Sequence, residues 1–425
     1  LTGGQSPPVP RPYRLALSLG LAAVGVRLWL ILGHLPRLFD TENMRAGFTL
    51  FSRGVMSDPF LVPTGPTAHV APLYPALIAV SSHLAGDAEN GLLLARSFIA
   101  IAFGAMVAAF PFIAEWLRFP RRAGWVAALL FLFPTPPVFM WIEVSGQHEA
   151  IVTGILFTFA VAATLGSILQ GRVTTQRAIL LGLLWAGATY SSPVAAPPLM
   201  TLLGGAWLLK LQPRRSLLRF GAALVASFTL AVTPWLVRNA RTVGGFAFIR
   251  DNFWLELYVS NAADAGPDMR DNIRTTMRRH PFFNRSEAEQ VSQVGEQRYN
   301  AARGAEARAW IRANPRRFVE LTLWRIRYFF APRLGVVFHP AFFIPTLLLS
   351  SIGLGIALMR GDRIVGLLAA IILTYAAPHF LVQASPRYSY PVLWILVLVA
   401  ATVALNAWDW MARRLRSRPL GNATA

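Results

Sequence analysis

The chain has 425 residues, of which 55% are hydrophobic and only 14% are charged, and its mean hydropathy is +0.47. About 25% of the residues of a soluble globular domain are charged, so this composition excludes that class and indicates a polytopic membrane protein. The net charge of +20 does not indicate a nucleic-acid partner, because many basic residues stand between apolar runs, as topology signals do. Cysteine is absent, which excludes disulfides, thiol nucleophiles and thiolate metal ligands.

Ten apolar segments predict transmembrane spans, each of which needs about 20 residues to cross a bilayer. The predicted spans are 15–33, 91–114, 123–140, 150–169, 178–190, 193–210, 220–237, 341–359, 364–382 and 391–411. The first segment lacks a small-residue cleavage site, so we expect it to remain as an anchor. The span 178–190 is short and is followed by Ser191-Ser192-Pro193, which predicts two half-buried helices that meet at a turn.

Arginine is concentrated in the short connections that follow the even-numbered spans and in the C-terminal tail. The positive-inside rule makes this side cytoplasmic, and ten spans place both termini there. The expected organisation is a cytoplasmic tail (1–14), a transmembrane module (15–237) with a first external loop (34–90), an external helical region (238–340), C-terminal transmembrane helices (341–411) and a second tail (412–425). In the external region, 286–313 is expected to form one helix that ends at Asn314-Pro315, and 316–331 an interfacial helix.

The first external loop carries two acids, Asp40 and Glu42, where the chain leaves the first span. Residues 44–55 show apolar side chains at helical spacing and predict an amphipathic helix in the membrane interface. A Pro- and Gly-rich turn with His69 follows, and Pro72-Leu73-Tyr74-Pro75 begins another apolar run. Acids at the mouth of a span are costly unless they have a function. Residues two apart on a helix do not face each other, so the two acids are not expected to act as an equivalent pair.

A second polar group, from Glu143 to Glu149, lies between the third and fourth predicted spans. Glu149 enters a span, which is costly in hydrocarbon. Two carboxylates and His148 could also hold a divalent cation. The alternative is that Gln147 and His148 only form hydrogen bonds at the interface.

Two arginines stand where predicted spans meet external segments: Arg238 in Pro234-Trp235-Leu236-Val237-Arg238-Asn239, and Arg387 in the turn before Pro391. A planar guanidinium suits a phosphate group. Arg238 could alternatively be a cation that extends to the interface, and Tyr388 could belong to an aromatic belt. His339 and His379 are isolated and are expected to be structural. No glycine-rich phosphate loop stands out, which argues against direct use of a cytoplasmic nucleotide.

Together these motifs resemble GT-C glycosyltransferases, in particular bacterial family 39-like enzymes of the protein O-mannosyltransferase and aminoarabinose transferase type. The matching positions are Asp40, the interfacial helix 44–55, Pro72 to Pro75, Glu149, Pro234 to Asn239 and Arg387 to Pro391. The resemblance implies an all-α polytopic membrane protein with about ten transmembrane helices, external interfacial helices and a helical external region. It further implies an inverting transferase that moves a sugar from a polyprenyl-phosphate carrier to a glycan, lipid or protein acceptor. The enzyme is expected in the bacterial inner membrane, in contact with membrane lipids, with its active site facing the periplasm or the cell exterior.

The resemblance assigns three groups of residues. The expected catalytic residues are Asp40 as the base, Glu42, whose role stays open, and Glu149, with Glu143 as its alternative. The expected donor-phosphate ligands are Arg238, Arg387 and Asn239; and the expected pocket residues are His69, Tyr74, His148 and Tyr388. A divalent cation, Mg²⁺ or Mn²⁺, could lie between Asp40 and Glu149.

Two other functions remain open at this point. A transporter or flippase of lipid-linked saccharides should have two related halves with broken helices at matching positions, and this pattern is not evident. A transferase of the O-antigen ligase or polymerase type would place arginine and histidine in one large external loop. The region 238–340 contains Arg270, Arg274, Arg278, Arg279 and His280, which is compatible with that alternative.

Overall fold

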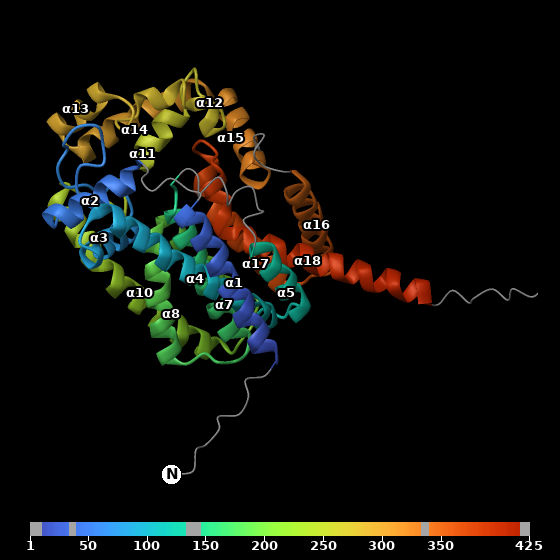
Figure 1. The fold of residues 1–425 in the computed structure, drawn as a ribbon. Coiled ribbons are helices and arrows are strands. Elements are labelled where there is room, and N and C mark those ends of the chain that lie inside the picture. Colours follow the sequence, from blue (N-terminus) through green and yellow to red (C-terminus); the bar gives the residue numbers. More distant parts are fainter. Residues whose placement is uncertain (1–10, 34–39, 133–145, 333–339, 417–425) are drawn as a thin grey trace, which may run out of the picture.

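Helices make up nearly all of the regular structure (Figure 1). The computed structural model describes residues 11–33, 40–132, 146–332 and 340–416, with side-chain surroundings from residue 344 onward in the last range. Within these ranges there is no β-sheet; two isolated β-bridges join Ser57 to Pro66 and Asp268 to Ala384. The all-α prediction is confirmed.

Six of the described helices are long and apolar enough to cross a membrane. They are α1 (Arg11–Gly33), α4 (Ala88–Trp116), α7 (Glu149–Leu169), α10 (Arg214–Thr242), α17 with its 3-10 extension η3 (Arg363–Phe380) and α18 (Pro386–Arg416). Each coincides with a predicted span. The other four predicted spans fall on shorter or partly described helices: α5 (Arg121–Leu132), α8 (Thr175–Ser191), α9 (Ala196–Leu208) and α16 (Pro340–Met359). The part of the span 123–140 beyond residue 132 lies outside the described residues.

The break predicted after 178–190 is present. Helix α8 ends at Ser191, the 3-10 turn η1 (Pro193–Ala195) follows, and α9 continues to Leu208. Pro193 cannot extend α8, because proline lacks the backbone N–H that an α-helix needs. The turn therefore places Ser191 and Ser192 at the end of the bundle, beside the start of α7.

Helix α7 is central in the bundle: it is mostly buried and contacts α4, α8 and α18, whereas α10 lies at the periphery against α8. The contact with α18 is close at Gly154, where an added Cβ would lie 2.5 Å from Cε1 of Tyr390. Any larger residue there would displace the Tyr390 ring. This close approach brings the first turn of α18 beside Glu149.

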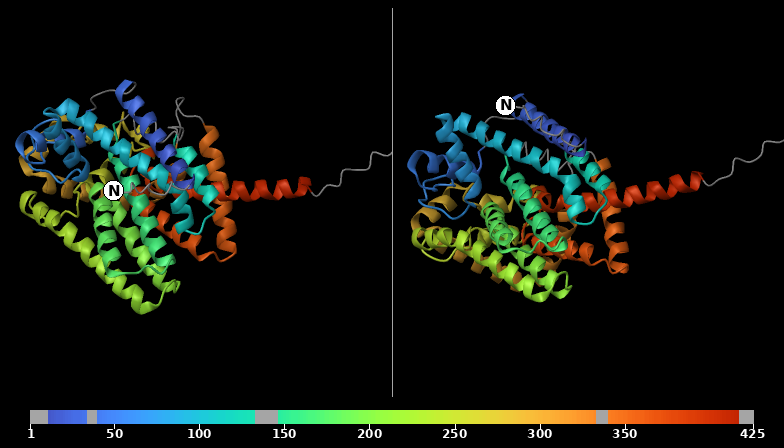
Figure 2. Two further views of the ribbon diagram at one scale, coloured as in Figure 1. Left: turned by 60° about the horizontal axis from the view of Figure 1, so that its bottom comes forward. Right: turned by 90° about the horizontal axis from the view of Figure 1, so that it is seen from below.

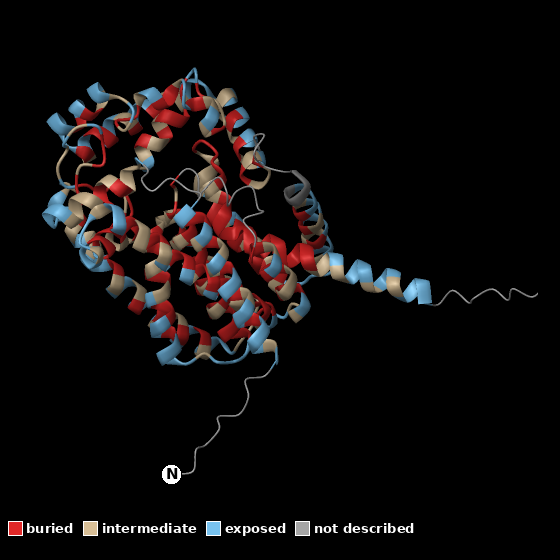
Figure 3. Cartoon of the chain, in the orientation of Figure 1, coloured by how far each residue is buried: buried red, intermediate tan, exposed pale blue. Residues whose placement is uncertain are grey.

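Helices α11 (Phe253–Ser260), α12 (Met269–Asn272), α13 (Arg285–Val294), α14 (Glu296–Ala313) and α15 (Pro315–Phe330), with the 3-10 turn η2 (Thr276–Arg279), lie over one end of the bundle (Figure 1). We call this the capped end. Both views in Figure 2 show the C-terminal half of α18 extending away from the other helices. Figure 3 shows buried residues where the long helices pack and mostly exposed or half-buried residues on that half of α18.

The prediction of a single helix over 286–313 is wrong in one respect: the helix is broken at Gly295 into α13 and α14. Gly295 has φ +86° and ψ 149°, a conformation that is essentially restricted to glycine. The break allows Glu296 to become buried as the first residue of α14. The predicted end at Asn314-Pro315 and the following helix are both present as expected.

A short helix, α3 (Leu73–Ala85), corresponds to the apolar stretch after Pro72. It packs against α2 (Glu42–Arg53) and α4. The residues between α2 and α3 are thereby held at the capped end, next to α10 and α14.

Candidate active site

The candidate active site begins at the N-terminus of α2. The side chain of Thr41 caps this helix by accepting a hydrogen bond from the backbone N–H of Met44 at 3.3 Å. Gly54, in the left-handed region with φ +67°, ends it. The amphipathic helix predicted over 44–55 is therefore present, displaced by two residues toward the N-terminus.

Asp40, immediately before the cap, forms a bidentate ion pair with Arg45. Nε and Nη2 of Arg45 each donate to one Asp40 oxygen at 2.7 Å. Arg45 also donates to the carbonyl oxygen of Phe60, and its guanidinium lies over the Phe282 ring at 4.9 Å. The Asp40 side chain is 64% exposed, so Arg45 orients its carboxylate while the carboxylate remains accessible to solvent.

Glu42 lies two residues further on, and its carboxylate is bound by histidines. Nε2 of His69 is 3.0 Å from Oε1 of Glu42, and Nε2 of His280 is 3.6 Å from the same oxygen. Nδ1 of His280 accepts a hydrogen bond from the Phe282 N–H at 3.1 Å, so without a metal Nε2 carries the proton of the neutral ring and faces Glu42. A cation bound at Nε2 would require this proton to move to Nδ1 and the hydrogen bond from Phe282 to break. We call Glu42, His69 and His280 the histidine cluster.

Electrostatics in the histidine cluster favour an ionised Glu42 beside a protonated His69. Burial opposes ionisation of Glu42, but the charge and hydrogen bond of His69, together with His280, hold the pKa of the Glu42 carboxyl well below its usual value. Burial also opposes protonation of His69, and Glu42 outweighs it and raises the pKa of His69. Burial lowers the pKa of His280. Protonated His69 thus places one positive charge beside the negative charge of the Glu42 carboxylate.

The same three residues fit a divalent cation. Each offers one ligand atom, and the three atoms lie within 4.8 Å of one another. Nδ1 of His69 is buried and has no hydrogen-bond partner among the described residues, so it can carry the ring proton if Nε2, which faces Glu42, binds a cation. Two imidazoles and one carboxylate suit Zn²⁺ or Mn²⁺ better than Mg²⁺, which prefers oxygen ligands. The pair named from the sequence, Asp40 and Glu149, is instead engaged in two separate ion pairs with arginines.

A buried acidic group lies behind the histidine cluster. Glu296 accepts hydrogen bonds from the hydroxyl of Thr67 and from the N–H of Ala68, the latter at 2.8 Å. Burial raises the pKa of Glu296, and burial together with the charge of Glu296 raises the pKa of Asp251 to about 7. The backbone N–H of Asp251 donates to the carbonyl oxygen of Ala68 at 2.8 Å. These bonds attach the first loop to α14 and to the segment before α11.

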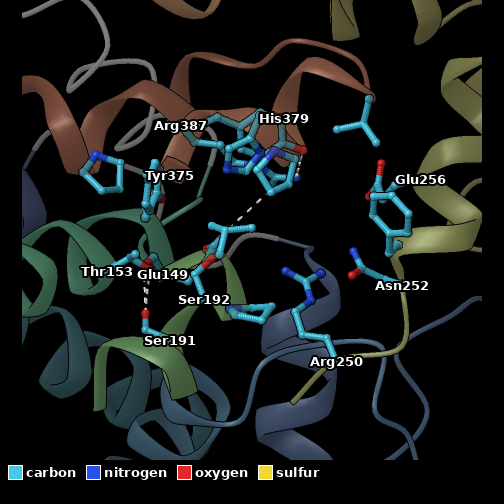
Figure 4. A pocket seen from close by; sticks show the side chains of 18 residues that line it. Glu149, Thr153, Ser191, Ser192, Arg250, Asn252, Glu256, Tyr375, His379 and Arg387 are labelled. Atoms are coloured by element: carbon cyan, nitrogen blue, oxygen red, sulfur yellow. Dashed lines mark hydrogen bonds and ion pairs between the residues drawn. The ribbon is translucent and has the colours of Figure 1, made fainter. Parts of the chain in front are cut away.

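A cavity of about 140 Å³ lies at the capped end, and its lining residues are drawn in Figure 4. One of them, Arg250, contacts the histidine cluster. One side comes from α7 and the α8 end, with Glu149, Thr153 and Ser191, and the facing side from Arg250, Asn252 and Glu256. His379, Arg387 and Tyr388 line it from α17 and α18. The hydroxyls of Thr153 and Ser191 are 2.7 Å apart, which joins α7 to α8 at the cavity wall.

Arg387 is the best-connected cation of the cavity. Its Nη1 donates to the Gln147 side chain and, at 3.3 Å, to Oε1 of Glu149; its Nη2 donates to the Tyr388 hydroxyl at 3.3 Å. The Tyr388 ring stacks on His379 with centroids 4.2 Å apart. His379, expected to be structural, thus holds a cavity-lining tyrosine. These contacts orient the guanidinium, and the Arg387 side chain remains 22% exposed.

Arg250 connects the cavity to the histidine cluster, because its Nε donates to the carbonyl oxygen of His69 at 3.0 Å. Burial, together with the nearby charge of Arg387, lowers the pKa of Arg250. Across the cavity, one carboxylate oxygen of Glu256 is buried with no hydrogen-bond partner among the residues described here. Two guanidinium groups and a carboxylate with a free oxygen therefore face the same small space.

Arg238 and Asn239 lie elsewhere. Nη1 of Arg238 donates to the Thr67 carbonyl at 2.7 Å and Nη2 to the Met56 carbonyl at 3.2 Å, and its guanidinium lies over the Trp235 ring at 4.8 Å. The buried Asn239 side chain donates to the carbonyl oxygens of Ala247 and Ile249, both at 3.2 Å. Neither residue lines the cavity. Their contacts hold the first loop and residues 247–249 against α10.

Tyr74 and His148, expected in the pocket, are buried neighbours with ring centroids 6.2 Å apart, outside the lining of the cavity. His69, also expected there, belongs to the histidine cluster. Glu143 and His339 lie outside the described residues.

Sequence reasoning did not assign roles to Arg250, Glu256 or Glu296, and it named His280 only within the ligase alternative. The signal for the first two was their position: Arg250 lies two residues before Asn252 and Glu256 four residues after it, in the segment that follows the Pro234–Asn239 motif. Glu296 had no local signal, because only the break at Gly295 makes it buried.

Comparison with known proteins gives matches among solved structures, while no protein-family model and no curated protein matches the chain. Similar structures include the archaeal oligosaccharyltransferase AglB from Archaeoglobus fulgidus with an inhibitory peptide and a dolichol-phosphate: TM-score 0.57, 14% identity, covering 97% of this chain and 52% of that one. The apo form of the Archaeoglobus fulgidus oligosaccharyltransferase gives a TM-score of 0.59 at 14% identity, covering 95% and 52%. Its complex with Zn and sulfate gives 0.57 at 14% identity, covering 95% and 50%.

The chain has the GT-C fold. It spans about half the length of the oligosaccharyltransferases that it matches. At this level of identity the likeness extends to the fold and not to the substrates. With six long apolar helices, the chain is a multi-pass membrane protein of this architecture.

Proposed function

We propose that this protein is a glycosyltransferase that moves a sugar from a polyprenyl-phosphate carrier to a glycan, lipid or protein acceptor, as the family 39-like enzymes do. The reaction inverts the anomeric centre. The protein lies in the bacterial inner membrane, and the capped end, with the region 238–340, faces the periplasm. The arginine distribution of the short loops supports this orientation.

The observation that carries the proposal is the cavity at the capped end, where Arg250 and Arg387 face Glu256 and Glu149. An apolar groove of about 450 Å³ beside α9 and α10 shares Pro193, Val194 and Pro378 with this cavity. A polar space that continues into an apolar groove suits a substrate with a charged head and a hydrocarbon tail. One of the structures with this fold contains a dolichol-phosphate, which belongs to that chemical class.

In the proposed reaction, the phosphate of the donor lies against Arg387 and Arg250. The acceptor oxygen attacks C1 of the sugar from the side opposite the phosphate; a C1–O bond to the acceptor forms as the C1–O bond to the phosphate breaks. The two guanidinium groups stabilise the charge that develops on the leaving phosphate. Glu149 holds Arg387 in position, and Glu256 accepts hydrogen bonds from sugar hydroxyls.

Asp40 is the proposed base that takes the proton of the acceptor. Its carboxylate is exposed, and Arg45 orients it. Glu42 is a poorer base, because its carboxylate is bound by His69 and its pKa is held well below the usual value by that histidine and His280.

The histidine cluster is the proposed site of a divalent cation, with Glu42, His69 and His280 as ligands. A bound cation would join the first loop to the region 238–340 and replace the positive charge that protonated His69 otherwise supplies. Zinc content of the purified protein, measured by elemental mass spectrometry, should be near one per chain and should fall in His280→Ala. Equal zinc in both proteins would remove the metal from this proposal and leave the cavity chemistry intact.

The test of the function is sugar transfer by the purified protein in detergent. Undecaprenyl phosphate linked to mannose, glucose or aminoarabinose serves as donor, and release of undecaprenyl phosphate is followed by mass spectrometry. At least one of these donors should be consumed, and Arg387→Ala should slow its consumption roughly ten- to hundredfold at a donor concentration below the KM. If only diphosphate-linked oligosaccharides react, the monophosphate donor is wrong.

A further inference from the structure

Another, larger cavity lies at the opposite end of the bundle from the candidate active site. Helix α17 begins at Arg363, at the end where this cavity lies, and leads through η3, which carries His379, to the capped end. Helix α18 then runs back from Arg387 at the capped end to Trp410 at the opposite end. The cavity has a volume of about 720 Å³ and is enclosed by the α4–α5 turn, α16, the start of α17 and the second half of α18. None of its lining residues belongs to the site described above.

The cavity has an apolar floor and a charged rim. Ile356 on α16 and Val399 and Val403 on α18 form part of the floor, and Arg118, Arg360 and Asp362 stand on the rim. Trp410 lines it as well and is half exposed. Tryptophan and arginine beside the ends of spanning helices are typical of the level of lipid headgroups.

The rim charges are available to a ligand. Nη2 of Arg118 donates a hydrogen bond to the carbonyl oxygen of Leu169 at 3.3 Å, which leaves its other N–H groups for a ligand. The Arg360 side chain forms no hydrogen bond or ion pair with another described residue. Oδ1 of Asp362 caps α17 by accepting from the N–H groups of Ile364 and Val365 at 3.0 and 3.1 Å. Its second oxygen makes no hydrogen bond within the described ranges. The rim thus offers two guanidinium groups and one carboxylate oxygen.

We propose that this cavity binds a phospholipid with a primary amine, such as phosphatidylethanolamine. The lipid phosphate pairs with Arg118 and Arg360, the ammonium group donates to Asp362, and the acyl chains lie along the apolar floor between α16 and α18. A choline headgroup has no N–H to donate to Asp362, and a glycerol headgroup has no cation to pair with it. The mixed charge of the rim therefore favours an aminophospholipid over both.

Native mass spectrometry of the full chain in detergent, with dioleoyl phosphatidylethanolamine, phosphatidylcholine and phosphatidylglycerol, tests this proposal. The ethanolamine lipid should bind about tenfold more tightly than the choline lipid, the effect of one charge-assisted hydrogen bond. Asp362→Asn keeps a good helix cap, because asparagine caps as well as aspartate does. This variant should reduce ethanolamine binding to the choline level without changing choline binding.

The double variant Arg118→Gln/Arg360→Gln should weaken all three lipids together, and Arg215→Gln, an exposed arginine outside the cavity, should change none. Tryptophan-fluorescence melting checks that each variant is folded, and Asp362→Asn keeps the test decisive if the double variant is not. Equal binding of the ethanolamine and choline lipids to the wild type, tighter binding of phosphatidylglycerol, or unchanged binding in Asp362→Asn would each overturn the assignment.

Discussion

Asp40 and Glu42 are two residues apart at the start of α2, yet they have different partners: Arg45 binds Asp40, and His69 binds Glu42. The difference follows from the cap at Thr41, because the residues on either side of an N-cap differ in backbone conformation. One acid is accessible and the other is engaged by the histidine cluster. Their roles in catalysis should therefore be separable by mutation.

Asp40→Asn should leave the protein folded and donor-bound but lower turnover by about 10²–10⁴-fold, because an amide cannot take up the acceptor's proton. Glu42→Gln is the matched change at the neighbouring acid and should mainly lower bound zinc and thermal stability. Turnover, zinc content and donor binding are measured separately. Near wild-type turnover in Asp40→Asn together with an inactive, zinc-containing Glu42→Gln would transfer the base to Glu42.

Arg387→Ala should weaken donor binding roughly ten- to hundredfold, because a charge-assisted contact to phosphate contributes about 1.5–3 kcal/mol. Arg238→Ala should lower thermal stability instead, since its guanidinium is bonded to the Thr67 and Met56 carbonyls. This order reverses the one that the Pro234–Asn239 motif predicts from sequence. Donor titration and melting of both variants distinguish the two orders: a larger loss of donor affinity in Arg238→Ala would favour the motif.

Asp251 makes stability depend on pH. Its pKa is raised from 3.8 to about 7 by burial and by Glu296, so the folded protein holds a proton that the unfolded chain releases. Stability from this group should therefore fall as the pH rises from about 4 to about 7. Asp251→Asn removes the titration and should raise the melting temperature at pH 8 by at least about 2 °C, with little effect at pH 4. An equal shift at both pH values would show that the effect is not ionisation.

Among the elements, the break between α13 and α14 has the clearest consequence for the site. Gly295 turns the chain so that Glu296 reaches Thr67 and Ala68, which adjoin His69. Without the break, Glu296 would continue an exposed polar helix. The break therefore couples the region 238–340 to the first loop.

Gly295→Ala should destabilise the folded protein by about 1–3 kcal/mol, because only glycine adopts φ +86° with ψ 149° readily. Gly25→Ala, inside α1 with nothing within 4 Å of an added Cβ, is the control and should be neutral or slightly stabilising. Thermal melting by tryptophan fluorescence measures both. Equal melting temperatures for the two variants would mean that α13 and α14 tolerate another path at the break.

At the scale of the whole molecule, the two cavities lie at opposite ends of the helices, one with a proposed sugar donor and the other with a proposed phospholipid. Which side of the membrane each cavity faces depends on the orientation of the protein. The arginine-rich connections predict that the end opposite the capped end is cytoplasmic.

Because the native chain has no cysteine, single cysteines report orientation without background. Ser286→Cys in α13 should react with an impermeant maleimide from the external side of intact cells. Gln176→Cys in α8, at the opposite end, should react only after permeabilisation. The reverse pattern would invert the topology and place the candidate active site in the cytoplasm.

Local patterns were sufficient for most of the helical segments, but not for the break at Gly295. Apolar runs, the Asn314-Pro315 helix end and the Ser192-Pro193 break depend on neighbours in the chain, so the helices could be predicted from sequence. Which residues lie close together in space could not be predicted in this way. The predicted partners Asp40 and Glu149 both pair with arginines, and the Arg238 motif predicted the position of a helix end but not its contacts.

The sequence by itself determined the class of protein, the helical segments and the polar residues at the ends of the spans, because hydropathy and helical period are properties of short segments. Only the tertiary structure decided which of those residues meet. The cavity draws on α7, α11, α17, α18 and the segment before α11, and the histidine cluster joins residues 42, 69 and 280. These contacts between distant residues depend on close helix packing, as at Gly154, and on the backbone break at Gly295. Neither feature can be predicted from the spacing of apolar residues along the chain.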